Sequence, residues 1–457
     1  MCTSSQAIKC VAILLAFAFS TENKCMAQRT LAIRGAKFET VSKAGAIEDG
    51  VILIRDGKIE AIGKDVKIPL ATQVIDAKGK TIMPGIVDPY YVISLGRDST
   101  AGESRTIVIN GRTIVVPGAP PSNSTSFSKI ADSIDLESID WKAARRSGIT
   151  TMQLVVSGYA QSVVAQTTAK GAQIVNPDGR LLVTVTNSTQ SLDVLRNGLR
   201  ALGNAGGPGV PGGGPGGPGG NFGRPPGGVR PGPPTPGPPT PGPPIPGPPV
   251  PGPSPQENQA ASANPASQAA AVSPTQKLWT DVREGKSSLF VNLNNAATIL
   301  HSVSATKESK QAKIVFIASG SDLMEAIGDL DPKLQVAILP PRIDFVPNTR
   351  DRINVPKVLS DKEMPFAFSL SLGQSEFRAQ QDTPLFSVSS LVRSGLNRQK
   401  ALEALTITPA KLVGVESEVG SLEVGKKANF LILDGDPFAA TTSIQRVFIE
   451  GKQIHEN

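Results

Sequence analysis

Short apolar runs separated by turn residues occupy both ends of the chain. Asp56 and Gly57 stand between two of these runs, and an Asp-Gly pair tolerates the positive φ angles of a tight hairpin turn. Because similar runs return near the C-terminus, we expect one small β domain assembled from residues 28–83 and 412–457. The expected strands are Thr30–Arg34, Val51–Arg55, Lys58–Ile62, Gln73–Asp76, Asn429–Leu433 and a closing run, Arg446–Gln453.

Between these ends, short apolar runs alternate with helical segments. Such alternation predicts parallel strands with helices outside the sheet, and the number of units over residues 84–411 favours a closed barrel. The expected strands are Ile82–Val87, Met152–Val156, Leu181–Val185, Leu289–Leu293, Ile314–Ala318, Val336–Leu339 and Phe366–Leu370. The expected helices are Trp141–Ser147, Ser191–Leu202, Ala296–Glu308, one from Asp322, and Arg398–Thr406.

Residues 203–275 interrupt that rhythm with a segment rich first in Gly and Pro, then in Ala, Ser, Gln and Pro. A five-residue unit repeats within it: TPGPP from Thr235 and Thr240, IPGPP from Ile245, then VPGPS. Glycine does not fall at every third position, which excludes a collagen helix. Proline removes backbone donors and the segment has little to bury, so we predict a disordered insertion in a barrel loop. A docking strip or a spacer is the alternative.

Residues 1–27 have the pattern of an export signal. Lys9 supplies a positive charge, Val11–Phe19 forms an apolar core too short to span a membrane comfortably, and small residues follow at cleavage spacing. We expect a periplasmic or cell-surface protein, which is not an integral membrane protein unless the leader is retained as an anchor. The mature chain then has no thiol for a disulfide, a nucleophile or a metal, because all three cysteines lie in the leader: Cys2, Cys10 and Cys25.

Composition sets few limits on function. The chain has 457 residues, of which 39% are hydrophobic, enough for a real core, and its formal net charge is +7. The 46 Lys and Arg residues are scattered among 39 Asp and Glu residues, and no basic run is interleaved with aromatic residues. This distribution indicates a solvated surface and argues against nucleic-acid binding.

Three groups of phrases, in this order and spacing, resemble the amidohydrolase superfamily, in particular its imidazolonepropionase-like and dihydroorotase-like metal-dependent hydrolases. They are Gly57–Gly63 with Val74–Asp88, then Ala143–Thr151, then Ala401–Pro409, Gly420–Asn429 and Asp434–Pro437. The resemblance covers nearly all of the chain outside the leader and the insertion. It implies a (β/α)8 TIM-like barrel with a β-sandwich built from both termini. It also implies a hydrolase of non-peptide carbon–nitrogen bonds that uses zinc or another divalent metal.

The motif that binds the metal in the family is degenerate here. In the family, the phrase that matches Pro84–Asp88 leads into a His-x-His pair, whereas Tyr90 and Val92 occupy those two positions in this chain. Valine cannot ligate a metal, and a neutral phenol is a poor ligand for a divalent ion.

The other ligand positions that the resemblance implies lack ligands as well. Asn292 stands where the family has a histidine on the fifth strand, and the sixth strand ends in Ala318 and Ser319. The eighth strand, Phe366–Gln374, contains no acid. The resemblance therefore implies an amidohydrolase-like chain without the family's metal site.

The histidine content supports the same expectation without any alignment. The whole chain has two histidines, His301 in an expected helix and His455 near the C-terminus, and both are expected on the surface. The acids nearest to strand ends, Asp88, Glu376 and Asp382, form no convincing cluster in the sequence. We therefore predict no metal ligand, no cofactor and no identifiable catalytic residue.

A ligand, if one binds, is expected at the C-terminal mouth of the barrel, where the loops after the strands gather. The main hypothesis is an exported homologue that has lost metal-dependent catalysis and binds or scaffolds an unknown small molecule or protein. The alternative is an active hydrolase of amide or cyclic amide bonds that uses a non-standard site. The polar groups expected nearest the ligand are Tyr90, Tyr91, Asn292, Asn294, Ser371 and Gln374.

Overall fold

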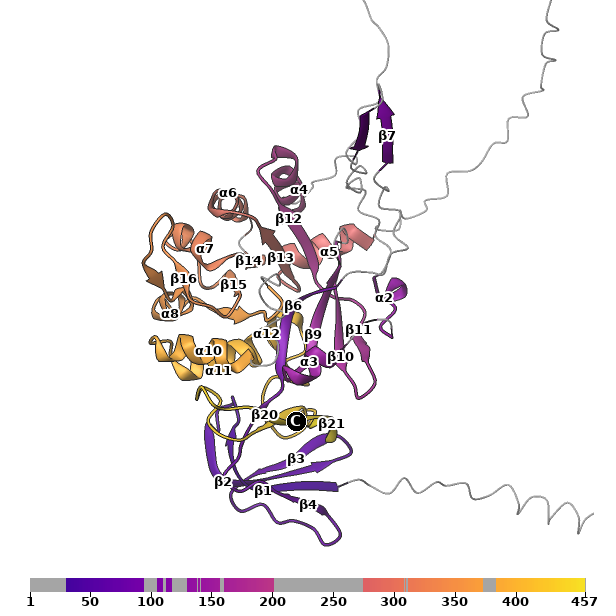
Figure 1. Ribbon diagram of the computed structural model, residues 1–457, viewed down its shortest axis with the longest axis vertical. Helices are drawn as coiled ribbons and strands as arrows, with labels where there is room; N and C mark the ends of the chain where they lie inside the picture. Colours follow the sequence, from indigo (N-terminus) through magenta and orange to yellow (C-terminus); the bar gives the residue numbers. More distant parts are fainter. Residues whose placement is uncertain are drawn as a thin grey trace, which may run out of the picture. The chain divides into compact units, whose positions relative to one another are not determined.

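The computed structural model describes residues 30–93, 105–109, 112–116, 130–137, 139, 141–156, 160–200, 274–307, 309, 311–372 and 384–456 (Figure 1). The predicted leader, residues 1–27, lies outside these ranges, as does the predicted insertion up to residue 273. Within the described ranges, no helix is long and apolar enough to cross a membrane.

Strands from both ends of the chain share one sheet, which we call the terminal sheet. Its strands follow the order β21-β20-β19-β5-β1-β2-β3, and β4 pairs with β1. Asp56 and Gly57 turn β2 into β3 with φ angles of 49° and 81°, so the predicted hairpin is confirmed. The strands are β1 (Thr30–Glu39), β2 (Ala46–Arg55), β3 (Lys58–Gly63), β4 (Gln73–Asp76), β5 (Thr81–Pro84), β19 (Phe430–Leu433), β20 (Ile444–Ile449) and β21 (Lys452–Glu456).

The terminal sheet has a hydrophobic core to which both ends of the chain contribute. Phe430 and Phe448 are register partners on β19 and β20, and their rings stack with centroids 4.7 Å apart. Ile33 and Phe38 of β1 are fully buried in the same cluster. The strands form one hydrogen-bonded sheet, and a two-layered β-sandwich stays a prediction.

Two further sheets form in the middle of the chain. The first has the order β11-β10-β9-β6, in which only β6 and β9 run parallel. The second, β12-β13-β14-β15-β18, is parallel throughout, as the strand and helix alternation predicts. The strands are β6 (Ile86–Ile93), β9 (Ile149–Val156), β10 (Val163–Thr167), β11 (Ala172–Asn176), β12 (Leu181–Val185), β13 (Ser288–Leu293), β14 (Lys313–Ile317), β15 (Gln335–Leu339) and β18 (Phe366–Phe368).

The predicted strand Ile82–Val87 is wrong, because the run is divided at Gly85 between β5 and β6, which belong to different sheets. The Gly85 N–H donates to the carbonyl of Asn429 at 3.0 Å. A Cβ atom at Gly85 would lie 2.3 Å from the Thr150 side chain, so only glycine fits where the chain leaves one sheet for the next.

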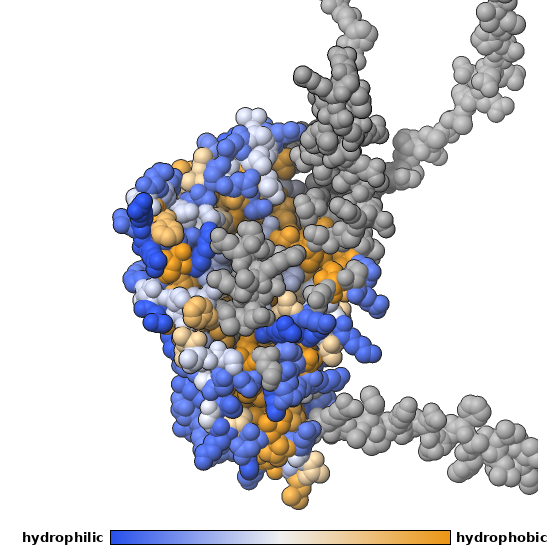
Figure 2. Space-filling view, viewed as in Figure 1, coloured by the Kyte–Doolittle hydropathy of each residue, from blue (hydrophilic) through white to orange (hydrophobic). Residues whose placement is uncertain are grey.

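Helices flank the parallel sheet. The helix α4 begins at the N-cap Ser188, whose side chain accepts a hydrogen bond from the Ser191 N–H, and it buries Leu192, Leu195 and Leu199 at helical spacing. Figure 2 shows that hydrophilic residues dominate the surface over the helices of this sheet, as expected of helices that bury one face. The helices are α2 (Ile130–Ser133), α3 (Lys142–Arg146), α4 (Thr189–Leu199), α5 (Pro274–Arg283), α6 (Ala296–Thr306), α7 (Gly320–Ala326), α8 (Val355–Asp361), α10 (Pro384–Arg393), α11 (Arg398–Leu405) and α12 (Ile407–Val413). Two small hairpins join β7 (Arg105–Ile109) to β8 (Arg112–Val116) and β16 (Asp344–Phe345) to β17 (Arg352–Ile353).

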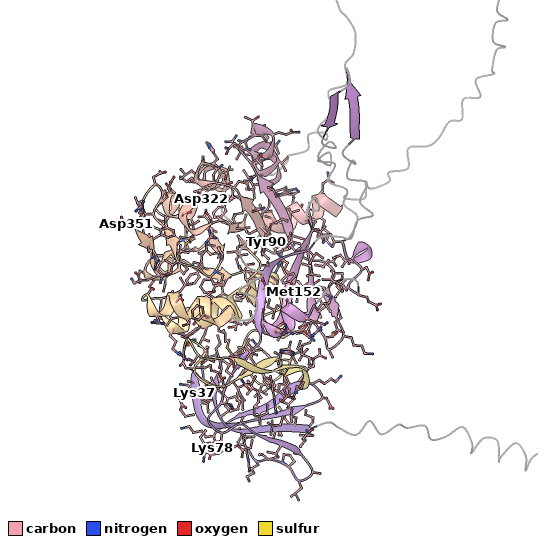
Figure 3. The ribbon with its side chains drawn as sticks, in the orientation of Figure 1. Lys37, Lys78, Tyr90, Met152, Asp322 and Asp351 are labelled. Carbon is pink, nitrogen blue, oxygen red and sulfur yellow. The ribbon has the colours of Figure 1, made fainter. Side chains whose placement is uncertain are left out.

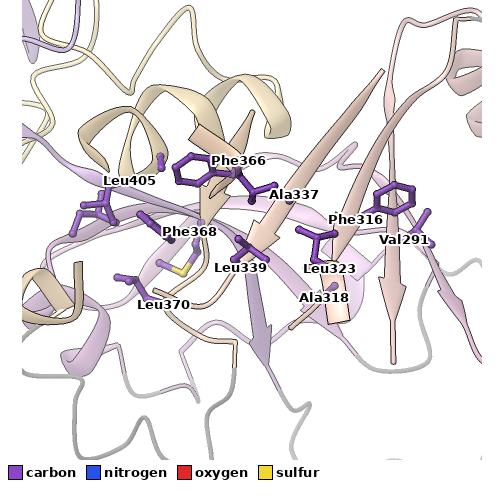
Figure 4. Close-up of a cluster of buried hydrophobic side chains, with 14 of the residues drawn as sticks. Val291, Phe316, Ala318, Leu323, Ala337, Leu339, Phe366, Phe368, Leu370 and Leu405 are labelled. Carbon is purple, nitrogen blue, oxygen red and sulfur yellow. The ribbon is translucent and has the colours of Figure 1, made fainter. Parts of the chain in front are cut away.

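Alternate residues of the parallel strands belong to two different cores. On one face, the helical face, Val291 and Phe316 join a large cluster that includes Leu323 of α7 (Figure 4). Residues on the other face, which we call the inner face, form a separate core. That core contains residues of both middle sheets: Val87, Tyr90, Val155, Val164, Phe290, Val315, Ile317, Ile338 and Ala367, joined by Ala410, Leu412 and Val413 of α12.

The described strands form no closed, all-parallel barrel, so the predicted eightfold arrangement is confirmed only as an α/β fold with helices outside a parallel sheet. Only six residues separate β9 from β10, which is too short for a parallel crossover, and β10 therefore runs antiparallel. Beside β12, two backbone hydrogen bonds take the place of a continuous ladder of hydrogen bonds between strands. The Leu182 N–H donates to the Ala160 carbonyl at 2.7 Å, and the Ser162 N–H donates to the Arg180 carbonyl at 3.0 Å.

Candidate functional site

The strand β6 contains a bulge at Pro89 and Tyr90. Asp88 is opposite Met152 of β9, but the next paired residue of β6 is Tyr91, so two residues of β6 oppose the one residue between Met152 and Leu154. Figure 3 shows Tyr90 and Met152 on these neighbouring strands. Proline has no N–H for a ladder, and prolines within sheets therefore occur at bulges and edges. The bulge interrupts the ladder beside Tyr90, whose backbone groups need other partners.

The Asp88 carboxylate supplies one of these partners and also binds the segment that follows β18. Its Oδ1 accepts a hydrogen bond from the Tyr90 N–H at 3.0 Å, and its Oδ2 accepts one from the Leu370 N–H, just beyond β18, also at 3.0 Å. The side chain is fully buried. Burial raises the pKa of Asp88 to about 6, and hydrogen bonds from the backbone and from Ser369 oppose that rise. Asp88 therefore joins β6 to the segment that follows β18.

The carbonyl of Tyr90 is bound by two hydroxyl groups from the same segment. Ser369 Oγ donates to it at 3.0 Å, and Ser371 Oγ donates to it as well. The Tyr90 ring is buried in the inner core, and this burial raises the pKa of its phenol. The phenol is therefore neutral near pH 7. We call Asp88, Tyr90, Ser369 and Ser371 together the β6–β18 seam.

Tyr90 and Ser371, both predicted to lie at the mouth, are thus brought together by a hydrogen bond. Tyr91 instead packs against the core of the helical face, with its ring centroid 6.1 Å from that of Trp141. Adjacent residues of a regular strand point to opposite faces. Here the bulge at Pro89 and Tyr90 determines which face of β6 each of the two tyrosines takes. Tyr91 is only partly buried.

The remaining predicted mouth residues lie on or beyond other strands. Asn292 is half-buried near the end of β13, two residues after Phe290 of the inner core, and Asn294 is exposed just beyond that strand. Gln374 lies outside the described residues. Asn292 and Ser371 therefore both lie toward the carboxyl ends of the parallel strands, which meet at the same edge of the sheet.

The sequence analysis missed Ser369 and did not foresee how Asp88 is used. Ser369 and Ser371 are two residues apart, so an extended chain puts both hydroxyl groups on one side, and this spacing was a usable signal. A proline inside an apolar strand, at Pro89, was a second signal, because a bulge needs side-chain partners. The partner strand itself was not readable, since 281 residues separate Ser371 from Tyr90.

Comparison with known proteins identifies the family. A model described as "Amidohydrolase family" matches residues 333–454, a range that runs from just before β15 through α12 and into β21. A solved structure, described as an amidohydrolase from Thermotoga maritima MSB8, aligns with a TM-score of 0.61 over 93% of this chain and 100% of that one, at 15% identity. The chain belongs to the amidohydrolase superfamily. The family expected from the sequence is thereby confirmed.

Curated relatives of this superfamily member align only in part. An imidazolonepropionase from Deinococcus radiodurans is 30% identical over 117 residues, which is 25% of this chain and 29% of that protein. An imidazolonepropionase from Streptomyces avermitilis is 28% identical over 165 residues, which is 32% of this chain and 38% of that protein. The chain therefore matches about a third of the length of these relatives.

The residues of this superfamily member do not fit a divalent metal at the end of β6. Both oxygens of Asp88 are engaged by backbone N–H groups, and the side chains bound beside it are hydroxyls of serine. Zinc in proteins takes nitrogen, thiolate and carboxylate ligands, and calcium takes several oxygens. In the part of the chain that the structure describes, no three His, Cys, Asp or Glu residues gather closely enough to hold a metal. His301 is exposed on α6, and His455 lies on β21 of the terminal sheet.

Proposed function

We propose that this amidohydrolase-superfamily protein binds a small molecule at the mouth of its parallel strands and does not carry out metal-dependent hydrolysis. The β6–β18 seam carries the proposal. At the end of β6, where the family motif leads to metal ligands, Asp88 gives its two oxygens to backbone N–H groups and Tyr90 gives its carbonyl to two serines. These groups hold two strands together, and a buried carboxylate used in this way is not free to bind an ion.

The proposed ligand site lies beyond the carboxyl ends of the parallel strands, where ligands of α/β folds bind. The residues proposed to line it are uncharged at pH 7, so they suit a neutral polar ligand that both donates and accepts hydrogen bonds. Of the residues predicted from the sequence, Asn292, Asn294 and Ser371 are the ones proposed to line it, beside the buried ring of Tyr90. Asn292 is the central one, since it follows Phe290 on the inner face of β13.

We also propose where the protein is located and how its sheets close. The leader, residues 1–27, would export the chain to the periplasm or the cell surface. The terminal sheet would fold over as a β-sandwich, and the middle strands would close into a barrel in the cyclic order β6, β9, β10, β12, β13, β14, β15 and β18. Closure is supported by the β6–β18 seam on one side and by the backbone bonds beside β12 on the other.

The second candidate function is hydrolysis of a non-peptide carbon–nitrogen bond through a non-standard site. The names of the curated relatives favour it, because those proteins are imidazolonepropionases, and on that ground alone it ranks above the binding function. The residues at the end of β6 favour the binding function, since activation of water by a metal requires ligands that this donor set does not supply.

The metal content of the purified chain without its leader separates the two functions. The protein is produced in medium that contains zinc, manganese and iron, and an imidazolonepropionase with a complete His-x-His motif is purified in parallel. We expect less than about 0.1 metal ion per chain here, against roughly one in the control protein. Stoichiometric metal, together with hydrolysis of any member of a panel of cyclic and linear amides, would establish the hydrolase and refute the binding proposal.

A ligand screen then tests the site itself. Neutral amides, lactams and cyclic ureas are screened by thermal shift against the wild-type chain, and each hit is measured again with Asn292→Ala. We expect the variant to weaken binding at least tenfold, because removal of a hydrogen-bonding group from a closed site costs about 1.4 kcal/mol or more. The exposed residue Asn197, in the last turn of α4, supplies the matched control, Asn197→Ala, which should bind as the wild type does. Equal affinity of the wild type and Asn292→Ala would exclude the mouth as the ligand site.

A further inference from the structure

Two buried polar side chains on β9 have no partners. Gln153 is 1% exposed, and neither its Nε2 nor its Oε1 forms a hydrogen bond. Thr151 is 2% exposed, and its Oγ1 likewise forms none. Buried carboxamide and hydroxyl groups in folded proteins are almost always hydrogen-bonded, because an unpaired one costs its full desolvation energy. Two such residues, two positions apart on one strand, therefore need an explanation.

Both side chains point to the inner face. Val155, two residues after Gln153, belongs to the inner core, and alternate residues of a strand share a face. The cross-strand neighbours agree with this assignment. Thr151 is opposite Val87 of β6, Gln153 is opposite Val164 of β10, and both valines lie in the inner core. These apolar neighbours have no hydrogen-bonding side chain to offer.

Polar groups continue from this point toward the terminal sheet. Gln166 of β10 is the register partner of Thr151, is 2% exposed, and donates from Nε2 to Oε1 of Glu450 at 3.3 Å. The Glu450 N–H donates to Oδ1 of Asn429 at 2.8 Å, and Nδ2 of Asn429 is again a buried atom without a partner. We call Gln153, Thr151, Gln166, Glu450 and Asn429 the inner polar stripe.

The unpaired atoms define the chemistry of an occupant. Nε2 of Gln153 and Nδ2 of Asn429 require an acceptor, whereas Oε1 of Gln153 requires a donor, and the Thr151 hydroxyl can serve as either. A simple anion cannot satisfy Oε1, and a metal cation cannot satisfy the amide N–H groups. The near-complete burial of Thr151 and Gln153 among valines further limits the size of the occupant.

We propose that the inner polar stripe is a binding site for small neutral molecules that both donate and accept hydrogen bonds, and that bound water fills it. The water connects Thr151 to Gln153 and extends the hydrogen-bonded path that begins at Glu450. Buried water of this kind makes two to four hydrogen bonds to polar groups that otherwise lack partners. The stripe extends from Gln153 toward the terminal sheet, and the proposal does not depend on the ligand proposed for the mouth.

Paired apolar substitutions test the proposal. Thr151→Val and Gln153→Met keep the approximate volume and remove the polar groups. With a shared bound molecule, each lowers Tm by about 2–4 °C, and the double variant loses less than the sum, because the second change removes a contact already broken. Thr167→Val is the matched control, since the Thr167 hydroxyl donates to the Ile149 carbonyl at 2.9 Å within the protein. Its loss of Tm should add to that of Gln153→Met.

A high-resolution crystal structure, with mass spectrometry of small molecules released on denaturation, identifies the occupant. Water density that bridges Thr151 and Gln153 supports the proposal as stated. A small organic molecule in the same place supports the site and replaces water as its occupant. Higher Tm values for Thr151→Val and Gln153→Met, together with an empty stripe, would overturn the proposal, because relief of unpaired polar groups stabilises the fold.

Discussion

The backbone N–H of Leu370 donates a hydrogen bond of 3.0 Å to Oδ2 of Asp88, and this bond ties the chain after β18 to β6 where no ladder joins the two strands. The second oxygen of the same carboxylate accepts from the Tyr90 N–H across the Pro89 bulge. One buried side chain thus replaces two ladder bonds. The acid of the phrase Pro84–Asp88 therefore has a structural use in this chain.

Replacement of Asp88 with Asn should destabilise the fold. Asparagine offers one acceptor oxygen, so its NH2 group would face one of the two backbone N–H donors and leave it unpaired. We expect the free energy of unfolding to fall by about 1.5–3 kcal/mol, measured by chemical denaturation. Asp76→Asn is the control, because Asp76 forms an exposed ion pair with Arg34 and should change stability by less than about 0.5 kcal/mol. Equal stability of Asp88→Asn and the wild type would contradict the role given to the seam.

The pH dependence of stability should carry the signature of Asp88. Burial raises its pKa from 3.8 to about 6, so between these values the folded chain holds a proton that the unfolded chain releases. Stability from this group is therefore fully present below pH 3.8 and is lost as the pH rises through about 6. The free energy of unfolding of the wild type, measured relative to that of Asp88→Asn, should fall over this window by up to about 3 kcal/mol. A rising difference would show that the two backbone donors outweigh burial.

Arg398 should be a stabilising contact between α11 and the terminal sheet. Its guanidinium donates to Glu39 at 2.8 Å and to Asp436 at 2.7 Å, and it lies 5.2 Å from the centroid of the Phe438 ring. Glu39 is only 6% exposed, so removal of the guanidinium leaves a nearly buried carboxylate with the more distant Lys37, at 3.6 Å, as its ion-pair partner. Arg398→Met should lower the free energy of unfolding by about 1–3 kcal/mol, measured by urea denaturation.

A double-mutant cycle distinguishes that ion pair from simple loss of packing. In Arg398→Met/Glu39→Gln a neutral carboxamide replaces the carboxylate. The double variant should therefore recover at least part of the stability lost in Arg398→Met. Additive losses would mean that Glu39 and Arg398 do not interact in solution.

Removal of the Pro- and Gly-rich segment should leave the rest of the fold intact. The helices on its two sides, α4 and α5, are joined directly, since Arg283 Nη1 donates to the Gly198 carbonyl at 2.9 Å. Deletion of residues 204–272 with a short Gly-Ser linker should change Tm by less than about 2 °C, measured by calorimetry. Gly198→Ala is the sensitive control, because a Cβ there would lie 2.5 Å from the ring of Trp279, and it should lower Tm. A deletion that unfolds the chain would give the segment a structural role.

The local pattern of apolar and turn residues predicted the helices, strands and turns whose interacting residues are close in sequence or whose residues are uniformly buried. The Asp56-Gly57 turn lies between β2 and β3 as expected, and the predicted strand Leu289–Leu293 corresponds to β13, Ser288–Leu293. The predicted helix Ala296–Glu308 corresponds to α6, Ala296–Thr306, with a capping box at Asn295. Turn chemistry and helix caps act over three or four residues, so a single sequence carries them in full.

The strand–turn–strand course after β9 was not predicted, and neither was the break at Gly85. Both depend on a partner that is distant in the chain: β10 pairs back onto β9, and Gly85 fits against Thr150. The role of Asp88 was missed for the same reason, because the acceptor is on β6 and one donor is on Leu370.

The sequence by itself determined the family, the contribution of both termini to one sheet, and the shortage of histidine, since these follow from motif order, apolar patterning and residue content. Only the tertiary structure decided which polar groups find partners within the protein. Asp88 accepts from the Leu370 N–H and Ser371 donates to the Tyr90 carbonyl, whereas Gln153 is left unpaired beside valines. Hydrogen-bond satisfaction is a property of neighbours in space, and chain order alone does not specify those neighbours.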